Sequence, residues 1–372
     1  MRDMMGIVLA DSQELRLNEL TQMRSVTALP FGGRYRLIDF ILSNMVNSGI
    51  INVGVATNIN YSSLMDHLGS GAPWDLNRKI YGLFMLPPYV RGGGVGISAG
   101  NIDQLYGILT FLRRSRQQYV LLASGKIVCN MTFDEALKKH IENDADITVI
   151  YHDKKEKDEQ LSRSTVFEVE EGGKVVGIEH EPHFPKSTLE GMDMYIIERI
   201  RLIELIEDAY ARGSHDFTRD ILLTELGKSK IYGYEYKGFV GKVDSVGTYY
   251  ENSMKMLDGD IRREIFGSKN LIYTKVKDQV PTQYAQSASV SDSLIADGCI
   301  IDGTVENSII SRGVHIAKGA VVKNSIVMQN SVIEENCDIE NVIIDKECTL
   351  RASKRLVGQP NYPVILPKRT LL

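Results

Sequence analysis

The first two-thirds of the chain alternate two kinds of hydrophobic pattern. Short apolar runs, such as residues 119–123, predict buried strands, and longer stretches with periodic apolar positions predict helices. Their alternation predicts an α/β domain with a mostly parallel mixed sheet and helices on both faces. The predicted strands are residues 7–10, 52–56, 119–123 and 146–151, with a hairpin turn at 171–174, and the predicted helices are 38–47, 101–116, 132–142, 198–211 and 248–257.

The pattern changes after residue 260. From residue 288, short clusters of β-branched residues are separated by Gly, Asn and Asp, and segments that begin with Asn307, Asn324 and Asn341 recur every seventeen residues. Three hexapeptides form about one coil of a left-handed parallel β-helix, so this period fits a coil with one shortened corner. An ordinary β-sandwich is the alternative, and the regular spacing disfavours it. Spacings of six occur at 310, 316, 322 and 328 and at 321, 327, 333 and 339, and the proposed corners are Gly298, Gly303, Gly313 and Gly319.

Length and composition fit a two-domain globular protein. The 372 residues suffice for two cores, and we expect a first domain over 1–258, a linker over 259–284 and a β-helix with a tail over 285–372. A net charge of −5 argues against nucleic acid or an anionic membrane as the main partner. The sequence has no membrane-spanning run and no signal peptide, so we expect a cytoplasmic protein. Reduced, packed thiols are expected at Cys129, Cys299, Cys337 and Cys348.

Several segments carry a family resemblance. Residues 31–40 read FGGRYRLIDF and are followed by Ser43-Asn44, residues 214–217 read SHDF, and residues 246–248 read VGT. Together with the predicted architecture, these segments resemble bacterial ADP-glucose pyrophosphorylase (glucose-1-phosphate adenylyltransferase) over essentially the whole chain. The resemblance implies a nucleotidyltransferase-like first domain. It also implies the family reaction, in which ATP and glucose 1-phosphate give ADP-glucose and pyrophosphate with magnesium.

The nucleotide loop departs from the family. In the family the first strand runs into a loop of the form A-G-G-x-G-x-R-L that wraps the triphosphate, and here Asp11, Ser12 and Glu14 replace its three glycines. Glycine lets backbone N–H groups approach phosphates closely, whereas two carboxylates would repel them. Arg16 is retained from the loop.

The other catalytic positions of the family are also replaced. The resemblance places Lys126 and Ser245 where the family has its two magnesium-binding aspartates, and Glu181 where it has the sugar-phosphate lysine. We expect the neighbouring Asp244 to point to the opposite face of a strand. Nucleotidyl transfer requires neutralisation of the pyrophosphate charge, so we expect no catalytic residue and no bound metal in this chain. The alternative is that another Asp or Glu has taken over.

Two further sets of residues match family positions. A vestigial substrate pocket would contain Arg16, Asn101, Asp103, Asp216 and Arg219, although the same residues could serve the fold, with Asp216 as a helix N-cap. Activator positions, at which the family binds phosphate groups, correspond to Arg24, Arg36 and Arg369. Their alternative role is ion pairing at a domain interface or, for Arg369, exposure in the tail.

Two other motifs are given structural explanations. The glycine-rich residues 91–96 do not follow a predicted strand, so a surface loop is favoured over a phosphate site. Left-handed β-helix acyltransferases use one histidine as general base, but the first domain resembles another family. An exposed structural histidine is therefore favoured at His315.

We therefore expect a regulatory, catalytically impaired subunit that resembles the D-type subunit of some Gram-positive bacteria. Its expected partner is an active catalytic subunit in a hetero-oligomer, as a tetramer, with magnesium bound by that partner and a phosphorylated or anionic effector. The first alternative is a self-sufficient sugar-phosphate nucleotidyltransferase with a rearranged site. The second is a ligand-binding sensor without a catalytic partner.

Overall fold

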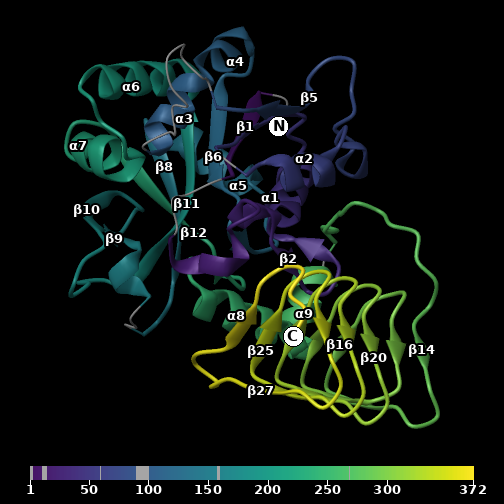
Figure 1. The fold of residues 1–372 in the computed structure, drawn as a ribbon. Coiled ribbons are helices and arrows are strands. Elements are labelled where there is room, and N and C mark those ends of the chain that lie inside the picture. The colour runs from purple at the N-terminus through teal and green to yellow at the C-terminus, as the bar shows by residue number, and fades with distance from the viewer. Residues whose placement is uncertain (1–2, 11–14, 59, 89–99, 157–159, 268) are drawn as a thin grey trace. The chain divides into compact units, whose positions relative to one another are not determined.

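The structure is a computed structural model that describes residues 3–10, 15–58, 60–88, 100–156, 160–267 and 269–372. It divides into two compact units, each assembled from separate stretches of chain (Figure 1). Unit 1 contains residues 1–13, 40–61 and 68–240, and unit 2 contains residues 14–39, 62–67 and 241–372.

Unit 1 is built on a mixed sheet of nine strands in the described part of the chain. Strands β1, β4, β5 and β6 are parallel to one another, as predicted, and β11 is antiparallel to β6, β8 and β9. The sheet order is β10-β9-β11-β6-β1-β4-β5, and β8 pairs with both β11 and β12. The strands are β1 (Met4–Leu9), β4 (Asn52–Ala56), β5 (Gly82–Leu86), β6 (Tyr119–Ser124), β8 (Ile147–Asp153), β9 (Thr165–Val169), β10 (Val175–His180), β11 (Leu189–Glu198) and β12 (Ile231–Glu235).

Helices cover both faces of this sheet, as the alternating pattern predicts. Residues of α3, α4 and α6 join β1, β6, β8 and β11 in one buried apolar cluster. On the opposite face, α1 packs so closely on β1 that a Cβ at Gly6 would lie 2.6 Å from the Met45 sulfur. The main helices are α1 (Leu37–Asn47), α3 (Asn101–Gly107), α4 (Leu109–Arg114), α5 (Asp134–Glu142), α6 (Arg199–Ala211) and α7 (Leu223–Glu225), with a π-helical turn at Phe217–Leu222.

One helix prediction in unit 1 is wrong. The single helix predicted over 101–116 is two helices, because Ile108 leaves helical geometry at φ −101° and ψ 7°. Gly107 immediately precedes the break, and glycine is a poor helix former.

Unit 2 contains five coils of parallel β-helix, stacked side by side in Figure 1. The predicted period of seventeen is observed between successive coils, as in the pairing of Val322 with Ile339. The buried inward positions follow one another at intervals of six, six and five, so the shortened corner lies between Val322 and Val327. Three five-stranded sheets form its sides: β14-β17-β20-β23-β26, β15-β18-β21-β24-β27 and β16-β19-β22-β25-β28. Their bounds are β14 (Gln283–Tyr284), β15 (Ser289–Ser291), β16 (Leu294–Ile295), β17 (Ile300–Ile301), β18 (Thr304–Glu306), β19 (Ile309–Ile310), β20 (His315–Ile316), β21 (Val321–Lys323), β22 (Ile326–Val327), β23 (Val332–Ile333), β24 (Asp338–Glu340), β25 (Val342–Ile344), β26 (Thr349–Leu350), β27 (Arg355–Val357) and β28 (Val364–Leu366).

The corners of the coils use glycine and asparagine for different reasons. Gly313 adopts φ +68°, in the left-handed region that favours glycine. Asn307, Asn324 and Asn341 also adopt left-handed φ, and the Asn307 side-chain amide donates a hydrogen bond to Asn324 Oδ1 at 2.7 Å. The recurring asparagines therefore occupy the same corner in successive coils and stack on one another. Gly303 is not left-handed; a Cβ there would lie 2.4 Å from the Ala320 carbonyl oxygen.

The rest of unit 2 packs on the β-helix, so this compact unit includes residues on both sides of position 258. The Tyr250 hydroxyl donates to the Asn324 carbonyl oxygen, and Arg24 forms an ion pair with Asp345. Both the segment before α1 and the helices after unit 1 thus belong with the coils. These elements are two 3-10 turns (Leu15–Leu20 and Val26–Ala28), β2 (Pro30–Phe31), β3 (Tyr35–Arg36), α2 (Ser62–Leu68), β13 (Gly241–Lys242), α8 (Val246–Met254), a third 3-10 turn (Lys255–Leu257) and α9 (Gly259–Phe266).

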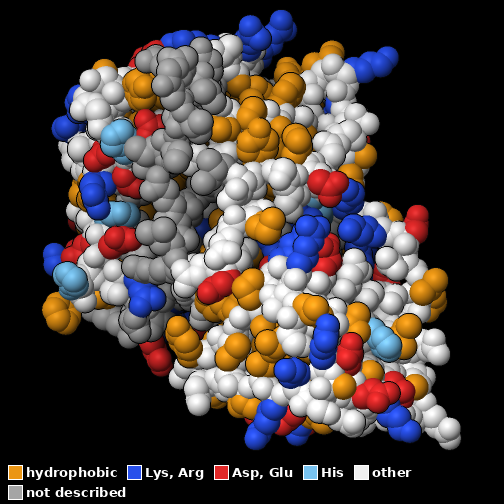
Figure 2. Space-filling model, in the orientation of Figure 1, with side chains coloured by type: hydrophobic (Ala, Val, Ile, Leu, Met, Phe, Trp, Pro, Cys, Tyr) orange, Lys and Arg blue, Asp and Glu red, His pale blue; other side chains and the backbone are white. Residues whose placement is uncertain are grey.

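The remaining features are the surface of the coils, the cysteines and the absence of a membrane-spanning helix in the described ranges. On the face of the coils drawn in Figure 2, hydrophobic side chains lie among single acidic and basic ones. The four cysteines are free and buried, as predicted. Within the described ranges, no helix combines the length and the hydrophobicity needed to cross a membrane.

Candidate functional site

Part of the predicted nucleotide site cannot be placed. Asp11, Ser12 and Glu14 lie outside the described residues, as do the side chain of Arg16 and the glycine-rich residues 91–96. The remaining positions are distributed over the two units, and each is described within its own unit.

Lys126 occupies the turn between β6 and a short strand, β7 (Ile127–Val128), in unit 1. Its Nζ lies 3.8 Å from Oδ2 of Asp193, and the two side chains are 12% and 25% exposed. Asp193 sits at a register shift in β11 with φ +50°, a conformation that residues other than glycine seldom adopt. An ammonium cannot ligate a divalent cation, and here it pairs with the carboxylate beside it. Sequence reasoning identified Lys126 but missed Asp193, which lies on a strand distant in sequence.

Glu181, predicted to occupy the sugar-phosphate position, follows β10 and is exposed. It adopts φ +48°, and its backbone N–H donates to the Ser164 carbonyl oxygen at 3.0 Å. No cation therefore stands at this position of the chain.

A second carboxylate in unit 1, not predicted, is fully enclosed. Glu190 is 1% exposed; its Oε2 lies 3.0 Å from His152 Nε2 and 3.7 Å from Lys154 Nζ, and Ser164 donates a hydrogen bond to its other oxygen. Lys154 and His152 thus both contact a buried carboxyl group.

The predicted vestigial pocket residues of unit 1 come together around the start of α3. Ile102 N–H donates to the His215 carbonyl oxygen at 3.1 Å, and a Cβ at Gly100 would lie 2.1 Å from that oxygen. Asn101 Oδ1 accepts from Phe217 N–H at 2.6 Å, and Asp103 Oδ2 lies 3.0 Å from His215 Nδ1.

The other two members of this set behave differently. Asp216 caps the following π-helical turn, because its Oδ1 accepts from Arg219 N–H at 2.7 Å. The Arg219 side chain is exposed. Asn101, Asp103 and Asp216 therefore all make local contacts that serve the fold.

Ser245, predicted to occupy the second metal position, is the N-cap of α8 in unit 2. Its Oγ accepts from Thr248 N–H at 3.2 Å, which completes a capping box. The prediction that Asp244 points away from Ser245 is wrong, since both side chains contact the Thr248 hydroxyl, at 2.9 Å for Asp244 Oδ1 and 3.1 Å for Ser245 Oγ. The two residues lie between β13 and α8, where the alternation of a strand does not apply.

The predicted effector residues occupy unit 2. Arg24 is 4% exposed and pairs with the fully buried Asp345. Arg36 Nη1 donates to the Ser63 carbonyl oxygen at 2.7 Å and to its hydroxyl at 3.1 Å. Burial lowers the pKa of Arg36 to about 10, with a further lowering from Arg24 and an opposing effect of Asp39. Arg369 is directed elsewhere: its Nε lies 2.6 Å from Glu347 Oε2, and its side chain is 66% exposed.

Two lysines that the sequence did not suggest adjoin Arg24 and Arg36. Burial, followed by the charges of Arg36 and Arg24, lowers the pKa of Lys346 to about 6. Burial and the charges of Arg36, Lys275 and Arg312 also lower the pKa of Lys277. Within the described chain, neither ammonium has an ion-pair partner, and the nearby Asp39 is already held by His67 at 2.6 Å. We call Arg24, Arg36, Lys277 and Lys346 the cation cluster. Near neutral pH the arginines carry most of the positive charge of this cluster, because Lys346 is then largely unprotonated, and this charge favours the approach of an anion.

Among the residues that the structure describes, no group of three or more His, Cys, Asp and Glu side chains is arranged to hold a metal ion.

Comparison with known proteins places the chain in a family. Residues 5–258 match the Nucleotidyl transferase family, and residues 278–360 match the GlmU-like, C-terminal hexapeptide family. The glycogen biosynthesis protein GlgD of Bacillus subtilis (strain 168) is 36% identical over 366 residues, which cover 98% of this chain and 96% of that protein. The chain belongs to the ADP-glucose pyrophosphorylase family and is of the GlgD type.

Relatives of both types resemble this GlgD-type chain to a similar degree. GlgD of Geobacillus stearothermophilus is 39% identical over 320 residues, and glucose-1-phosphate adenylyltransferase of the same organism is 36% identical over 323 residues. Each match covers 86% of this chain and 82% of the relative. The resemblance deduced from the motifs is thus confirmed, and so is the fold class.

Proposed function

We propose that this chain is a regulatory, catalytically impaired subunit of glucose-1-phosphate adenylyltransferase that acts with an active catalytic subunit in bacterial glycogen biosynthesis. The observation that carries the proposal is the Lys126–Asp193 ion pair at the position of a metal-binding aspartate. The names of the GlgD relatives support the assignment to glycogen synthesis.

The loss of catalysis follows from charge. A divalent cation stabilises both the attacking and the leaving oxygens in nucleotidyl transfer, and it needs oxygen ligands. Lys126 supplies a positive charge in place of such a ligand, and Ser245 is engaged in capping α8. Glu181 adds a negative charge at the sugar-phosphate position. The three replacements act against the same step, and magnesium belongs in the partner's site.

A regulatory role is supported by the cation cluster. Arg24, Arg36, Lys277 and Lys346 concentrate positive charge within unit 2, and a phosphorylated or sulfated effector would relieve their mutual repulsion. Arg369, the third residue predicted for this site, pairs with Glu347 and is not part of the cluster, whereas Lys346 is.

A partner subunit is supported by the open end of the β-helix. Strands β14, β15 and β16 each pair on one side only within the described chain. In this first coil Tyr284 and Val290 are 54% and 39% exposed, whereas their counterparts in the next coil, Ile301 and Val305, are fully buried. An apolar end with unpaired strand edges is suited to cover by another chain.

Activity measurements test the proposal. The purified chain should form no ADP-glucose above background with saturating ATP, glucose 1-phosphate and magnesium. Mixed with a catalytic subunit, it should raise specific activity or change the response to anionic effectors. A turnover near one per second by the chain alone would overturn the proposal, since that rate lies in the ordinary range for enzymes. Two species that remain separate in size-exclusion chromatography after co-expression would also contradict it.

One observation favours a second candidate, a self-sufficient nucleotidyltransferase with a rearranged site. Asp244 is 7% exposed, and within the described part its Oδ2 has no hydrogen-bond partner. Such a carboxylate could act as a displaced metal ligand. Any turnover by the chain alone should then disappear in Asp244→Asn.

A further inference from the structure

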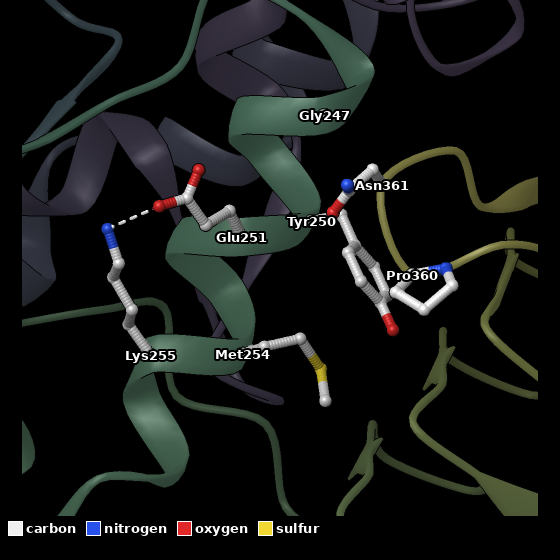
Figure 3. A pocket seen from close by; sticks show the side chains of 7 residues that line it. All are labelled: Gly247, Tyr250, Glu251, Met254, Lys255, Pro360 and Asn361. Atoms are coloured by element: carbon white, nitrogen blue, oxygen red, sulfur yellow. Dashed lines mark ion pairs between the residues drawn. The ribbon is translucent and has the colours of Figure 1, made fainter. Parts of the chain in front are cut away.

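We propose that a pocket between α8 and the loop after β27 binds the uncharged end of an α-glucan chain. The pocket lies wholly within unit 2 and has a volume of about 560 Å³. This is within the usual range for small-molecule sites. Figure 3 shows its two walls, one from α8 and the other from residues 360 and 361.

The wall on α8 follows the helical repeat. Gly247, Tyr250, Glu251, Met254 and Lys255 recur at intervals of three and four, so they share one face of the helix. The tyrosine ring is fixed at this face, because its hydroxyl donates to the Asn324 carbonyl oxygen. Burial, with a smaller effect of Glu340, raises the pKa of Tyr250 to about 12, so the hydroxyl remains a donor. Because Tyr250 is 8% exposed, a small part of a fixed aromatic side chain lines the pocket.

Gly247 widens the pocket, and the fold does not require glycine at this position. Its φ is not in the left-handed region, and a Cβ there would meet only the Ser245 hydroxyl, at 3.9 Å. Neither backbone strain nor close packing thus requires glycine at this position, in the first turn of α8. The missing side chain leaves room beside Tyr250.

The chemistry of the lining fits a neutral sugar. Tyr250, Met254 and Pro360 offer apolar surface to the C–H faces of a pyranose ring, and the Asn361 amide can both donate to and accept from hydroxyl groups. Glu251 and Lys255 neutralise one another at 2.6 Å, so the lining has no net charge to attract a phosphate. Tyr362, next along the loop, has a side chain that is 82% exposed, which gives a chain of several sugars a further ring to contact. The choice of an α-glucan rests on the proposed role in glycogen biosynthesis.

Calorimetric titration of the full-length chain with maltopentaose tests this inference. We expect saturable binding that glucose 1-phosphate at equal concentration does not displace. Gly247→Leu, which fills the pocket, and Asn361→Ala, which removes its amide, should each weaken binding at least about tenfold. Gly259→Leu is the matched control, because Gly259 begins the neighbouring helix α9 and a Cβ there would meet nothing within 4 Å.

Three outcomes would overturn the inference. They are an absence of maltopentaose binding, its displacement by glucose 1-phosphate, and equal weakening by Gly247→Leu and Gly259→Leu. Melting temperatures close to that of the unsubstituted chain would show that the variants are folded. The effect of the chain on a catalytic subunit is measured without glucan, so failure of this inference and failure of the proposed function can be told apart.

Discussion

Two lysines in different units of this protein have opposite electrostatic surroundings. Lys126 of unit 1 is largely enclosed and has Asp193 beside it at 3.8 Å. Lys346 of unit 2 has two arginines and another lysine near it, and its pKa is lowered to about 6. Asp345, the one carboxylate acting on it favourably, is already paired with Arg24.

The difference indicates at which lysine the charge is balanced within the chain and at which it needs an added anion. The charge at Lys126 is satisfied within the chain, so this position needs no ligand and offers none to a metal. The charged form of Lys346 is disfavoured by its surroundings, and an added anion would stabilise that form. The proposed loss of catalysis and the proposed regulatory site would thus have the same physical basis, the placement of a lysine relative to a carboxylate.

The largest expected effect concerns the pair that anchors the cation cluster. Arg24→Ala would leave Asp345, which is fully buried, without its charge partner. We expect a loss of about 3–5 kcal/mol in the free energy of unfolding, measured by urea denaturation. Arg113→Ala is the control, because its pair with Glu207 is exposed and worth about 1 kcal/mol or less. Equal losses in the two variants would show that the Arg24–Asp345 pair contributes no more to stability than an exposed ion pair.

The next effect concerns sulfate binding by the cation cluster. Because a sulfate ion favours protonated Lys346, its binding above pH 6 requires proton uptake, and affinity should fall by up to about tenfold per pH unit between pH 6 and 8. Lys346→Arg should bind sulfate with little pH dependence in this range, because arginine stays charged. Calorimetry in two buffers of different ionisation enthalpy measures both the affinity and the proton uptake. A flat pH profile for the unsubstituted chain would refute the assignment.

Lys346 should also make the free energy of unfolding depend on pH in a definite direction. Its pKa is lowered to about 6 from the usual 10.5, so between these values the unfolded chain holds a proton that the folded chain lacks. Stability should therefore rise with pH over this window, and Lys346→Gln should remove that contribution. Urea denaturation at pH 6 and pH 8 would measure the difference. An unchanged pH dependence in Lys346→Gln would contradict it.

A smaller effect is expected at Lys126. Lys126→Asp would place a second carboxylate next to Asp193 and destroy the ion pair. We expect the variant to melt a few degrees lower without metal and to recover in magnesium, whereas magnesium should leave the unsubstituted chain unchanged. Lys126→Met removes the positive charge without adding a metal ligand. Its melting temperature should therefore be lower than that of the unsubstituted chain and should not recover in magnesium. Recovery of Lys126→Met in magnesium would invalidate the explanation.

The smallest effect is that of Ser245→Ala. Loss of the N-cap of α8 should cost about 1 kcal/mol in thermal or urea denaturation. Ser289→Ala, in an exposed strand of the first coil, should be close to neutral. A cost of several kcal/mol at Ser245 would indicate a role beyond helix capping.

The repeating parts of the fold could be predicted because local spacing determines them. The strand predicted over 52–56 coincides with β4, and the seventeen-residue period gave the coils. The break at Ile108 escaped the prediction because the apolar spacing continues across it, although the backbone does not. The long antiparallel strand β11 was missed because both of its faces are largely buried, which hides the alternation of a half-exposed strand.

The site was predictable only where a motif marks it. Lys126 and Ser245 could be named from the resemblance, and their roles in an ion pair and a helix cap came from tertiary contacts. Asp193 carries no sequence signal beyond an aspartate within an apolar run. Lys277 and Lys346 join Arg24 and Arg36 from more than 200 positions away, so no local pattern could connect them.

The interleaved make-up of unit 2 has a consequence for synthesis on the ribosome. Unit 1 can be completed once residue 240 has emerged, whereas unit 2 needs the last coils before its first segment can settle. Arg24 precedes Asp345 by 321 positions, so at cellular elongation rates it waits roughly 16 to 64 seconds for its partner. Through that interval Leu17 and Leu20, both buried in the finished protein, belong to a 3-10 turn that lacks its contact with β28. The nascent chain should therefore bind chaperones during synthesis. Ribosome stalling near the end of the message should leave unit 2 unfolded, although most of the chain has already been made.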